Sequence, residues 1–133
     1  MIIVIDNNVL LDALLERNPF YADAANFLID CINNHTGFVT ANSLTDIFYV
    51  LTKIIGAQKT KRSIQKLIGL FDIIPIGVTD CINALELPMD DFENALLVIC
   101  AMNIGADYIV SRDAILLKTA PIKAILPVDF LNL

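Results

Sequence analysis

The sequence opens with an unbroken apolar run over residues 1–5, which ends at Asp6. Because hydrophobic and polar residues do not alternate in this run, it predicts a strand that is buried on both faces, as in a parallel sheet. Open parallel sheets bind ligands beside the carboxyl ends of their strands. Asp6 is therefore expected either at such a binding edge or, equally, as the N-cap of the helix that follows it.

Strand-like and helix-like segments alternate along the rest of the chain. Short apolar runs predict further strands at residues 37–40, 71–76, 108–111 and 122–126. Helical periodicity predicts helices at residues 8–15, 21–32, 44–55, 60–70, 79–85 and 91–104, and a helical turn at 114–118. Strands separated by helices pair in parallel through right-handed crossovers, so the 133 residues predict one doubly wound α/β domain over residues 1–133.

Composition narrows the cellular setting. Hydrophobic residues make up 56% of the chain, yet no apolar run reaches the roughly 18 residues that a membrane span needs. The amino terminus lacks a charged segment before its apolar run, so we expect neither a signal peptide nor a membrane segment. Three widely spaced cysteines, Cys31, Cys81 and Cys100, predict free thiols in a reducing cytoplasm.

The charge balance restricts the possible nucleic-acid surfaces. A net charge of −6 argues against a large basic surface, although it is compatible with a nuclease site built of carboxylates. The one basic cluster is Lys59, Lys61, Arg62 and Lys66, and its spacing places three of these residues on one helix face. This face is interpreted either as solvated surface or as a phosphate contact that involves Arg62.

Acidic residues recur near the predicted carboxyl ends of strands. Asp6, Asp46 and Asp113 are expected at the same sheet edge, while Asp90 and Asp91 open the long helix that contains Asn94. Each also has a structural explanation as a cap; Ser43 with Asp46, for example, resembles a capping box at the start of its helix. Several carboxylates at one edge repel one another unless a divalent cation compensates them.

Four segments in this order resemble the PIN-domain family, most closely its bacterial VapC-like members: residues 5–12, 43–51, 91–96 and 105–113. The resemblance implies a single three-layer α/β/α domain with a five-stranded parallel sheet. It further implies hydrolysis of RNA with Mg²⁺ or Mn²⁺, by the toxin component of a toxin–antitoxin pair. A cognate antitoxin and a second copy of the chain, in a homodimer, would be its protein partners.

The resemblance also assigns roles to individual residues. The implied catalytic residues are Asp6, Asp46, Asp91 and Asp113. The implied metal ligands are Asp6, Asp91, Asn94 and Asp113. Asn8, Ser43 and Asp90 would support the site, and Arg112 and Arg62 would contact the substrate.

The chain departs from the family pattern at two of these positions. Asn94 stands where the family usually has Asp, so it can offer a neutral oxygen but no charge. Asp91 is the better substitute for that anion if the helix starts at Asp90, and Asp46 is one methylene shorter than the usual Glu. Two functions therefore remain open: a metal-dependent ribonuclease, or an inactive PIN-like module that binds RNA or protein.

An excess of apolar residues bears on assembly. One buried stripe of a helix needs fewer hydrophobic side chains than these segments carry. The residues that make up this apolar surface are Leu10, Leu11, Leu14, Phe48, Val50 and Leu51. This excess favours the homodimer that the resemblance implies.

Overall fold

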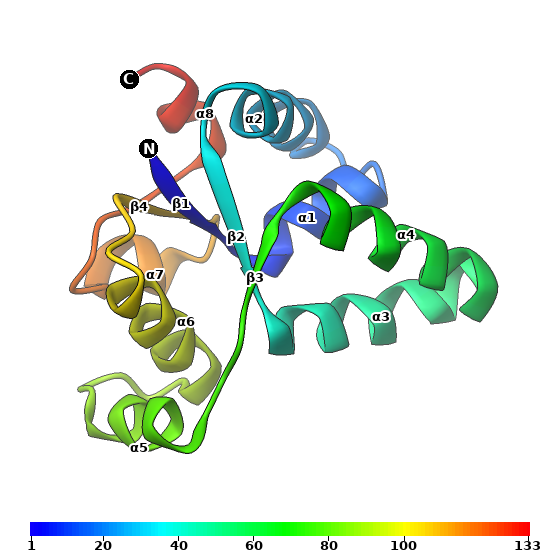
Figure 1. Cartoon of the computed structure of the whole chain (residues 1–133). Coiled ribbons are helices and arrows are strands. Elements are labelled where there is room, and N and C mark those ends of the chain that lie inside the picture. Colours follow the sequence, from blue (N-terminus) through cyan, green and yellow to red (C-terminus); the bar gives the residue numbers. More distant parts are fainter.

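Five parallel strands form the centre of the computed structural model, which describes residues 1–133 (Figure 1). The strands are β1 (Ile2–Ile5), β2 (Thr36–Thr40), β3 (Asp72–Ile74), β4 (Tyr108–Val110) and β5 (Ala124–Ile125), in the order β3-β2-β1-β4-β5. The opening strand lies in the middle, where Ile3 is in register with both Gly37 and Tyr108. Its central place explains why the sequence of β1 is apolar without alternation.

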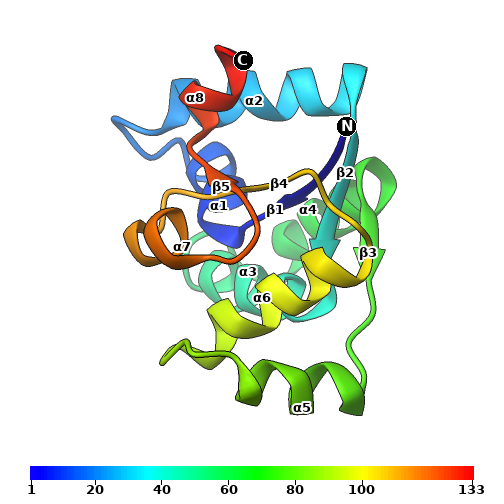
Figure 2. The ribbon, with the colours of Figure 1, turned by 90° about the vertical axis from the view of Figure 1, so that its left-hand side faces the viewer.

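Helices cover both faces of the sheet. One face carries α1 (Asn7–Leu14), α2 (Tyr21–Asn34), α3 (Ala41–Ile55), α4 (Ala57–Leu70) and the short α8 (Pro127–Leu131). The other face carries α6 (Phe92–Asn103) and α7 (Ala114–Thr119), and α5 (Val78–Glu86) packs outside α6 (Figure 2). The predicted three-layer α/β/α fold with a five-stranded parallel sheet is confirmed. None of the helices combines the length and hydrophobicity needed to cross a bilayer.

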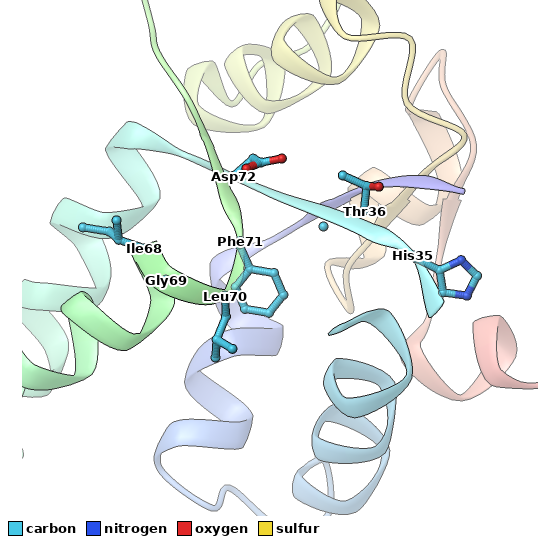
Figure 3. Close-up of a pocket in the computed structure, with 8 residues that line it drawn as sticks. His35, Thr36, Ile68, Gly69, Leu70, Phe71 and Asp72 are labelled. Atoms are coloured by element: carbon cyan, nitrogen blue, oxygen red, sulfur yellow. The ribbon is translucent and has the colours of Figure 1, made fainter. Parts of the chain in front are cut away.

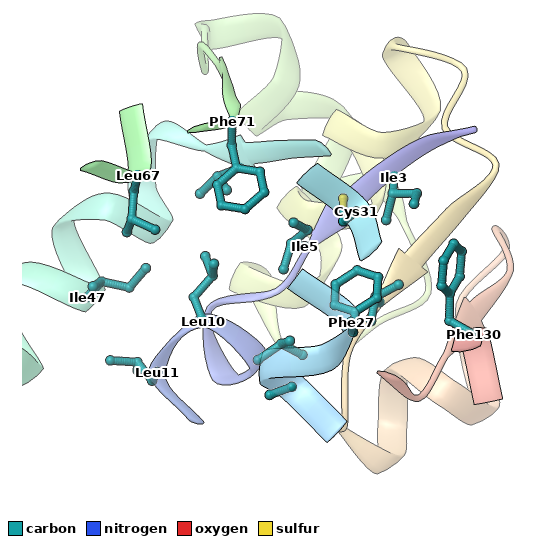
Figure 4. Close-up of a cluster of buried hydrophobic side chains, with 14 of the residues drawn as sticks. Ile3, Ile5, Leu10, Leu11, Phe27, Cys31, Ile47, Leu67, Phe71 and Phe130 are labelled. Carbon is teal, nitrogen blue, oxygen red and sulfur yellow. The ribbon is translucent and has the colours of Figure 1, made fainter. Parts of the chain in front are cut away.

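The side chains on the two faces of β1 pack into two separate hydrophobic clusters. Ile3 and Ile5 point into the larger cluster, where they pack with Phe27 and the rings and aliphatic chains around it (Figure 4). Val4 points to the opposite face and packs with Val98 from α6. Successive side chains on a strand face opposite ways, so this short strand anchors both helical layers and holds its carboxyl end rigidly.

Three sequence predictions about the fold are corrected. The expected strand at 122–126 is only Ala124–Ile125, because Pro127 begins the unpredicted helix α8 at its first position. The expected strand at 71–76 is only Asp72–Ile74, since Phe71 still caps α4 and Pro75 cannot continue the ladder.

The apolar excess that favoured a dimer is the third correction. Leu10, Leu11 and Leu51 lie inside the larger core cluster with at most 6% of their surface exposed. These three are therefore needed to cover the sheet within one chain. Only Leu14, which is 38% exposed, and the half-buried Phe48 and Val50 remain as surface that a second copy could cover.

Candidate functional site

The topology brings Asp6 and Asp113 to one point. From central β1 the chain builds β2 and β3 on one side, and it then crosses to β4 on the other side of β1. Such a switch point leaves a crevice at the carboxyl ends of the two strands where the order reverses. Asp6 directly follows β1 and Asp113 lies shortly after β4, so both acids lie at the carboxyl edge of the sheet, where the strand order reverses.

Asp6 is buried, with 9% of its surface exposed, and both of its carboxylate oxygens are occupied. Its Oδ1 accepts a hydrogen bond from the backbone N–H of Asn7 at 2.8 Å, and this bond makes Asp6 the N-cap of α1. Its Oδ2 accepts from Ser111 Oγ at 2.8 Å and from Asn8 Nδ2 at 3.2 Å. The interpretation of Asp6 as a helix cap is therefore confirmed, and its role as a ligand at this edge of the sheet stays a prediction.

The environment of Asp6 raises its pKa. Burial is the main cause, and it outweighs the hydrogen bonds from Ser111 and Asn7, which favour the charged form. The negative charges of Asp113 and Asp91 raise the pKa further. Asp6, Asp91 and Asp113 thus share one electrostatic environment, in which an added cation would be stabilised.

Ser111 links the two acids of the crevice. Its hydroxyl donates to Asp6 and accepts the backbone N–H of Asp113 at 3.0 Å. Asp113 in turn caps α7, because its Oδ1 accepts the backbone N–H groups of Ile115 at 2.9 Å and Leu116 at 3.1 Å. Ser111 was not singled out in the sequence, although its place between β4 and Asp113 is the signal that could have found it.

A second pair of acids faces the same edge. Asn7 donates its side-chain amide to Asp46 Oδ2 at 3.3 Å and to Glu93 Oε1 at 3.4 Å. A hydrogen bond to Asp46, burial and repulsion from Asp46, Asp6 and Asp91 raise the pKa of Glu93 to about 7. Glu93 can therefore hold a proton near neutral pH, and it is the acid that sequence reasoning left out of the site.

The predicted capping role of Ser43 is wrong. Helix α3 begins at Ala41 with Thr40 as its N-cap, and Thr40 Oγ1 accepts the backbone N–H of Ser43 at 3.4 Å. Because the helix starts earlier than predicted, Asp46 lies in its second turn rather than its first. Ser43 is buried against Thr40, where it supports the helix start from inside.

The residue at which α6 starts gives the candidate residues between 90 and 94 different structural positions. Asp91 is the N-cap and accepts the backbone N–H of Asn94 at 3.0 Å, so the helix begins at Phe92 and not at Asp90. Asp90 is exposed outside the helix and makes no hydrogen bond, which corrects its expected place at the start of the helix that contains Asn94. Asn94 itself is buried, with 9% of its surface exposed.

The two predicted substrate-binding arginines have different surroundings. Arg112 donates its backbone N–H to Asn8 Oδ1 at 3.3 Å, which places it directly beside the acids. Its guanidinium donates to Asp12 through Nε at 2.6 Å and Nη2 at 3.0 Å, and this pairing raises the pKa of Arg112. Arg62 is exposed on α4, and no hydrogen bond or ion pair links it to the carboxylates.

The donor set fits a hard divalent cation in charge and chemistry. Carboxylate and amide oxygens are the ligands such ions prefer, and neighbouring negative charges add to the raised pKa values of Asp6 and Glu93. One oxygen each of Asp91 and Asp113 is engaged in a helix cap, while the other accepts no hydrogen bond. The present rotamers do not group three acidic side chains around one point, so shared coordination requires these side chains to turn.

A pocket at the opposite edge of the sheet lacks this cluster of carboxylates. It has a volume of about 160 Å³ and lies where β2 and β3 begin, with His35, Thr36, Phe71 and Asp72 in its lining (Figure 3). Asp72 is its only carboxylate, and His35 is engaged by the amino group of Met1 and by Asp30. The acidic edge near Asp6 is therefore the stronger candidate for phosphodiester chemistry.

Comparison with known proteins agrees with this geometry. The family model described as PIN domain matches residues 2–114. Ribonuclease VapC1 of Aquifex aeolicus (strain VF5) is 27% identical over 117 residues, which cover 84% of this chain and 81% of that protein.

Solved structures share the fold at lower identity. A toxin–antitoxin complex from Klebsiella pneumoniae superposes with a TM-score of 0.72 at 16% identity, covering 93% of this chain and 96% of that one. VapC20 of Mycobacterium tuberculosis, described as a toxin that cleaves the sarcin–ricin loop, gives a TM-score of 0.68 at 10% identity, covering 80% and 86%. At these identities the likeness shows a common fold.

Proposed function

The chain belongs to the PIN-domain family, and we propose that it is a ribonuclease whose acidic edge uses Mg²⁺ or Mn²⁺ to hydrolyse RNA phosphodiesters. The relative from Aquifex aeolicus is named a ribonuclease, which supports RNA as the substrate class. The observation that carries the proposal is the position of Asp6. The charged form of a buried carboxylate beside two further carboxylates is disfavoured, and a bound cation would compensate that charge.

We assign the cation to Asp6, Asp91 and Asp113, with Asn94 as a neutral oxygen donor. When bound, such an ion orients and activates water and stabilises charge on the leaving oxygen. Ser111 and Asn8 fix the orientation of Asp6 through its Oδ2, so the turning of side chains that shared coordination requires falls to Asp91 and Asp113. Because Asn94 lacks the usual negative charge, the affinity for the ion is expected to be lower than with Asp at that position.

Glu93 and Asp46 supply the second part of the proposed site. Asn7 holds both carboxylates, and in the metal-free site a hydrogen bond to Asp46, burial and neighbouring negative charges raise the pKa of Glu93 to about 7. A group with this property is suited to proton transfer at the attacking or the leaving oxygen. Asp46 acts here as the partner that tunes Glu93, in addition to its implied catalytic place.

We further propose that the chain is a toxin component restrained by an antitoxin. The neighbour from Klebsiella pneumoniae is a toxin–antitoxin complex, which supports a protein partner of this kind. An apolar groove of about 240 Å³ between α1, α2 and α4, with Leu14 and Ile32 exposed at its surface, is the face best suited to an apolar partner segment. A homodimer remains part of the proposal, and a monomer in light scattering at micromolar concentration, without any partner, would contradict it.

Because Asn94 lacks the usual negative charge, one alternative function remains open. If the missing charge abolishes metal binding, the same fold would serve as a module that recognises RNA or protein without cleaving it. The two functions differ in one variant, Asn94→Asp, which restores an anion next to Asp91. This substitution should raise metal affinity and cleavage if the site is a weakened enzyme.

The deciding experiment measures cleavage of a labelled single-stranded RNA with and without Mn²⁺. Asp6→Asn should abolish manganese-dependent cleavage, because it removes the central negative ligand, while far-UV circular dichroism shows an unchanged fold. Asp129→Asn, at an exposed position on α8, is the matched control and should cleave like the wild type. Equal cleavage by all these proteins, independent of metal, would leave only the recognition function.

A further inference from the structure

A further cavity, of about 310 Å³, lies beside Arg112 at the acidic edge of the sheet. It is lined in part by Asp12, Pro19, Phe20, Asp23, Arg112 and Pro127. These residues come from α1, from the segment before and at the start of α2, and from the segments that follow β4 and β5. The cavity therefore opens beyond the carboxyl ends of the strands, as the Asp6 crevice does, and not at the edge shown in Figure 3.

Arg112 contacts both the acidic edge and this cavity. Its backbone N–H donates to Asn8 Oδ1 at 3.3 Å, and Asn8 Nδ2 donates to Asp6 at 3.2 Å. Its side chain lines the cavity, where the guanidinium carbon lies 4.0 Å above the centre of the Phe20 ring. Two hydrogen bonds thus connect the backbone of Arg112 to the central acid, so the cavity that its side chain lines is adjacent to the acidic edge.

The one cation that lines this cavity is already paired. The guanidinium of Arg112 makes two hydrogen bonds to Asp12, which is 1% exposed, and Asp23 adds a further negative charge to the lining. A second phosphate would find no unpaired cation there. An uncharged ligand is favoured instead.

The walls of the cavity suit a flat, uncharged ring. Phe20 is 41% exposed, and Pro19 and Pro127 add apolar surface around the Arg112–Phe20 stack. Aromatic rings and guanidinium planes are the groups on which proteins stack unpaired RNA bases. The carboxylate of Asp23 can accept a hydrogen bond from an exocyclic amino group of such a base.

We propose that this cavity binds one unpaired nucleobase of single-stranded RNA, next to the phosphate held at the acidic edge. The proposal rests on the ribonuclease function above, which it deepens by assigning substrate recognition to Phe20 and Arg112. Asp12 is a positioning residue, because it fixes the plane of the Arg112 guanidinium.

The test measures binding of a fluorescein-labelled uridine octamer that carries one central 2-aminopurine, with Ca²⁺ replacing Mn²⁺. Anisotropy of the fluorescein reports affinity, and loss of 2-aminopurine fluorescence reports stacking of the base. Phe20→Leu removes the ring but keeps apolar volume, and it should weaken binding about tenfold and abolish the quenching. Phe20→Trp retains a stacking surface and should restore both signals.

The chain offers a closely matched control in Tyr49→Leu. Tyr49 is also an exposed aromatic residue with a cation stacked on it, since Lys53 Nζ lies 4.0 Å from its ring centre, but it lies on α3 outside the cavity. Its substitution should leave affinity and quenching unchanged. Thermal unfolding of each variant verifies that the fold is intact, which the partial exposure of Phe20 favours.

Two results would overturn the nucleobase assignment. If Phe20→Leu binds the octamer as the wild type does, the cavity does not hold a base, as would also be found if it accommodated a protein segment. If the wild type does not quench 2-aminopurine at any position along the octamer, the assignment also fails. Manganese-dependent cleavage that is lost in Asp6→Asn would uphold the ribonuclease function in either case, so the two failures are distinguishable.

Discussion

The buried ion pair between Asp12 and Arg112 provides a stability prediction whose size can be worked out from the structure. Asp12→Asn removes the charge that accepts two hydrogen bonds from Arg112, at 2.6 and 3.0 Å. Removing one partner of a fully buried pair destabilises a protein by about 3–5 kcal/mol. Here the Arg112 side chain is 30% exposed, so water can solvate part of the released guanidinium.

The expected loss is therefore near the value for one hydrogen bond to a charged group, about 2–3 kcal/mol in the free energy of unfolding. Urea denaturation at pH 7, followed by circular dichroism, measures it directly. Arg17→Gln is the control, because Arg17 contacts the same carboxylate at 3.7 Å with 37% of its side chain exposed. Exposed pairs of this kind contribute about 0–1 kcal/mol. The reasoning is refuted if Asp12→Asn costs no more than Arg17→Gln.

Two further predictions concern the acidic edge and the core. Titration by carboxyl ¹³C NMR should place the pKa of Glu93 at about 7, and because this value exceeds the ordinary 4.5, stability should fall as pH rises from about 4.5 to about 7. Glu93→Gln should flatten that decline, whereas an unchanged pH profile would contradict the assigned cause. Gly37→Ala should destabilise the fold by about 1–3 kcal/mol in urea, since its new Cβ would lie 2.7 Å from Phe71 Cδ1 and 2.9 Å from Cys31 Sγ. Gly69→Ala, which meets nothing within 4 Å on its helix, should instead stabilise by about 0.4–1 kcal/mol, and a loss of similar size at both glycines would disprove the steric account.

The sequence predicted the parts of the site that depend on strand ends. An apolar run without alternation identifies a strand buried on both faces, and the residue after it must lie at the carboxyl edge, as Asp6 does. The same logic placed Asp113 after β4. These positions follow from the topology of a parallel sheet and need no knowledge of side-chain packing.

Positions that depend on where a helix starts were harder to predict. The first residue of a helix is set by its cap: Asp91 begins α6 at Phe92, and Thr40 begins α3 at Ala41. A shift of one or two residues rotates a helix face, and hydrophobic periodicity does not fix the starting residue. For this reason Glu93 was missed, although it shares Asn7 with Asp46.

Short elements form the remaining difference. Helix α8 contains five residues, too few to show a helical repeat, and it is held by packing of Phe130 against Phe27 with ring centres 5.3 Å apart. That contact joins residues more than one hundred positions apart, so no local pattern in the sequence predicts it. The same holds for the Arg112–Phe20 stack, which only the folded chain assembles.

The claim on which this account depends is that Asp6, Asp91 and Asp113 share one divalent cation. Anomalous diffraction from crystals of the full chain soaked in Mn²⁺ tests it directly, because manganese is located independently of any assumed ligand. The account predicts one anomalous peak at the acidic edge within ligand distance of Asp6 and Asp113, and its absence in Asp6→Asn crystals soaked in parallel. A wild-type crystal with no peak at this edge, or with manganese bound only elsewhere on the surface, would contradict the account.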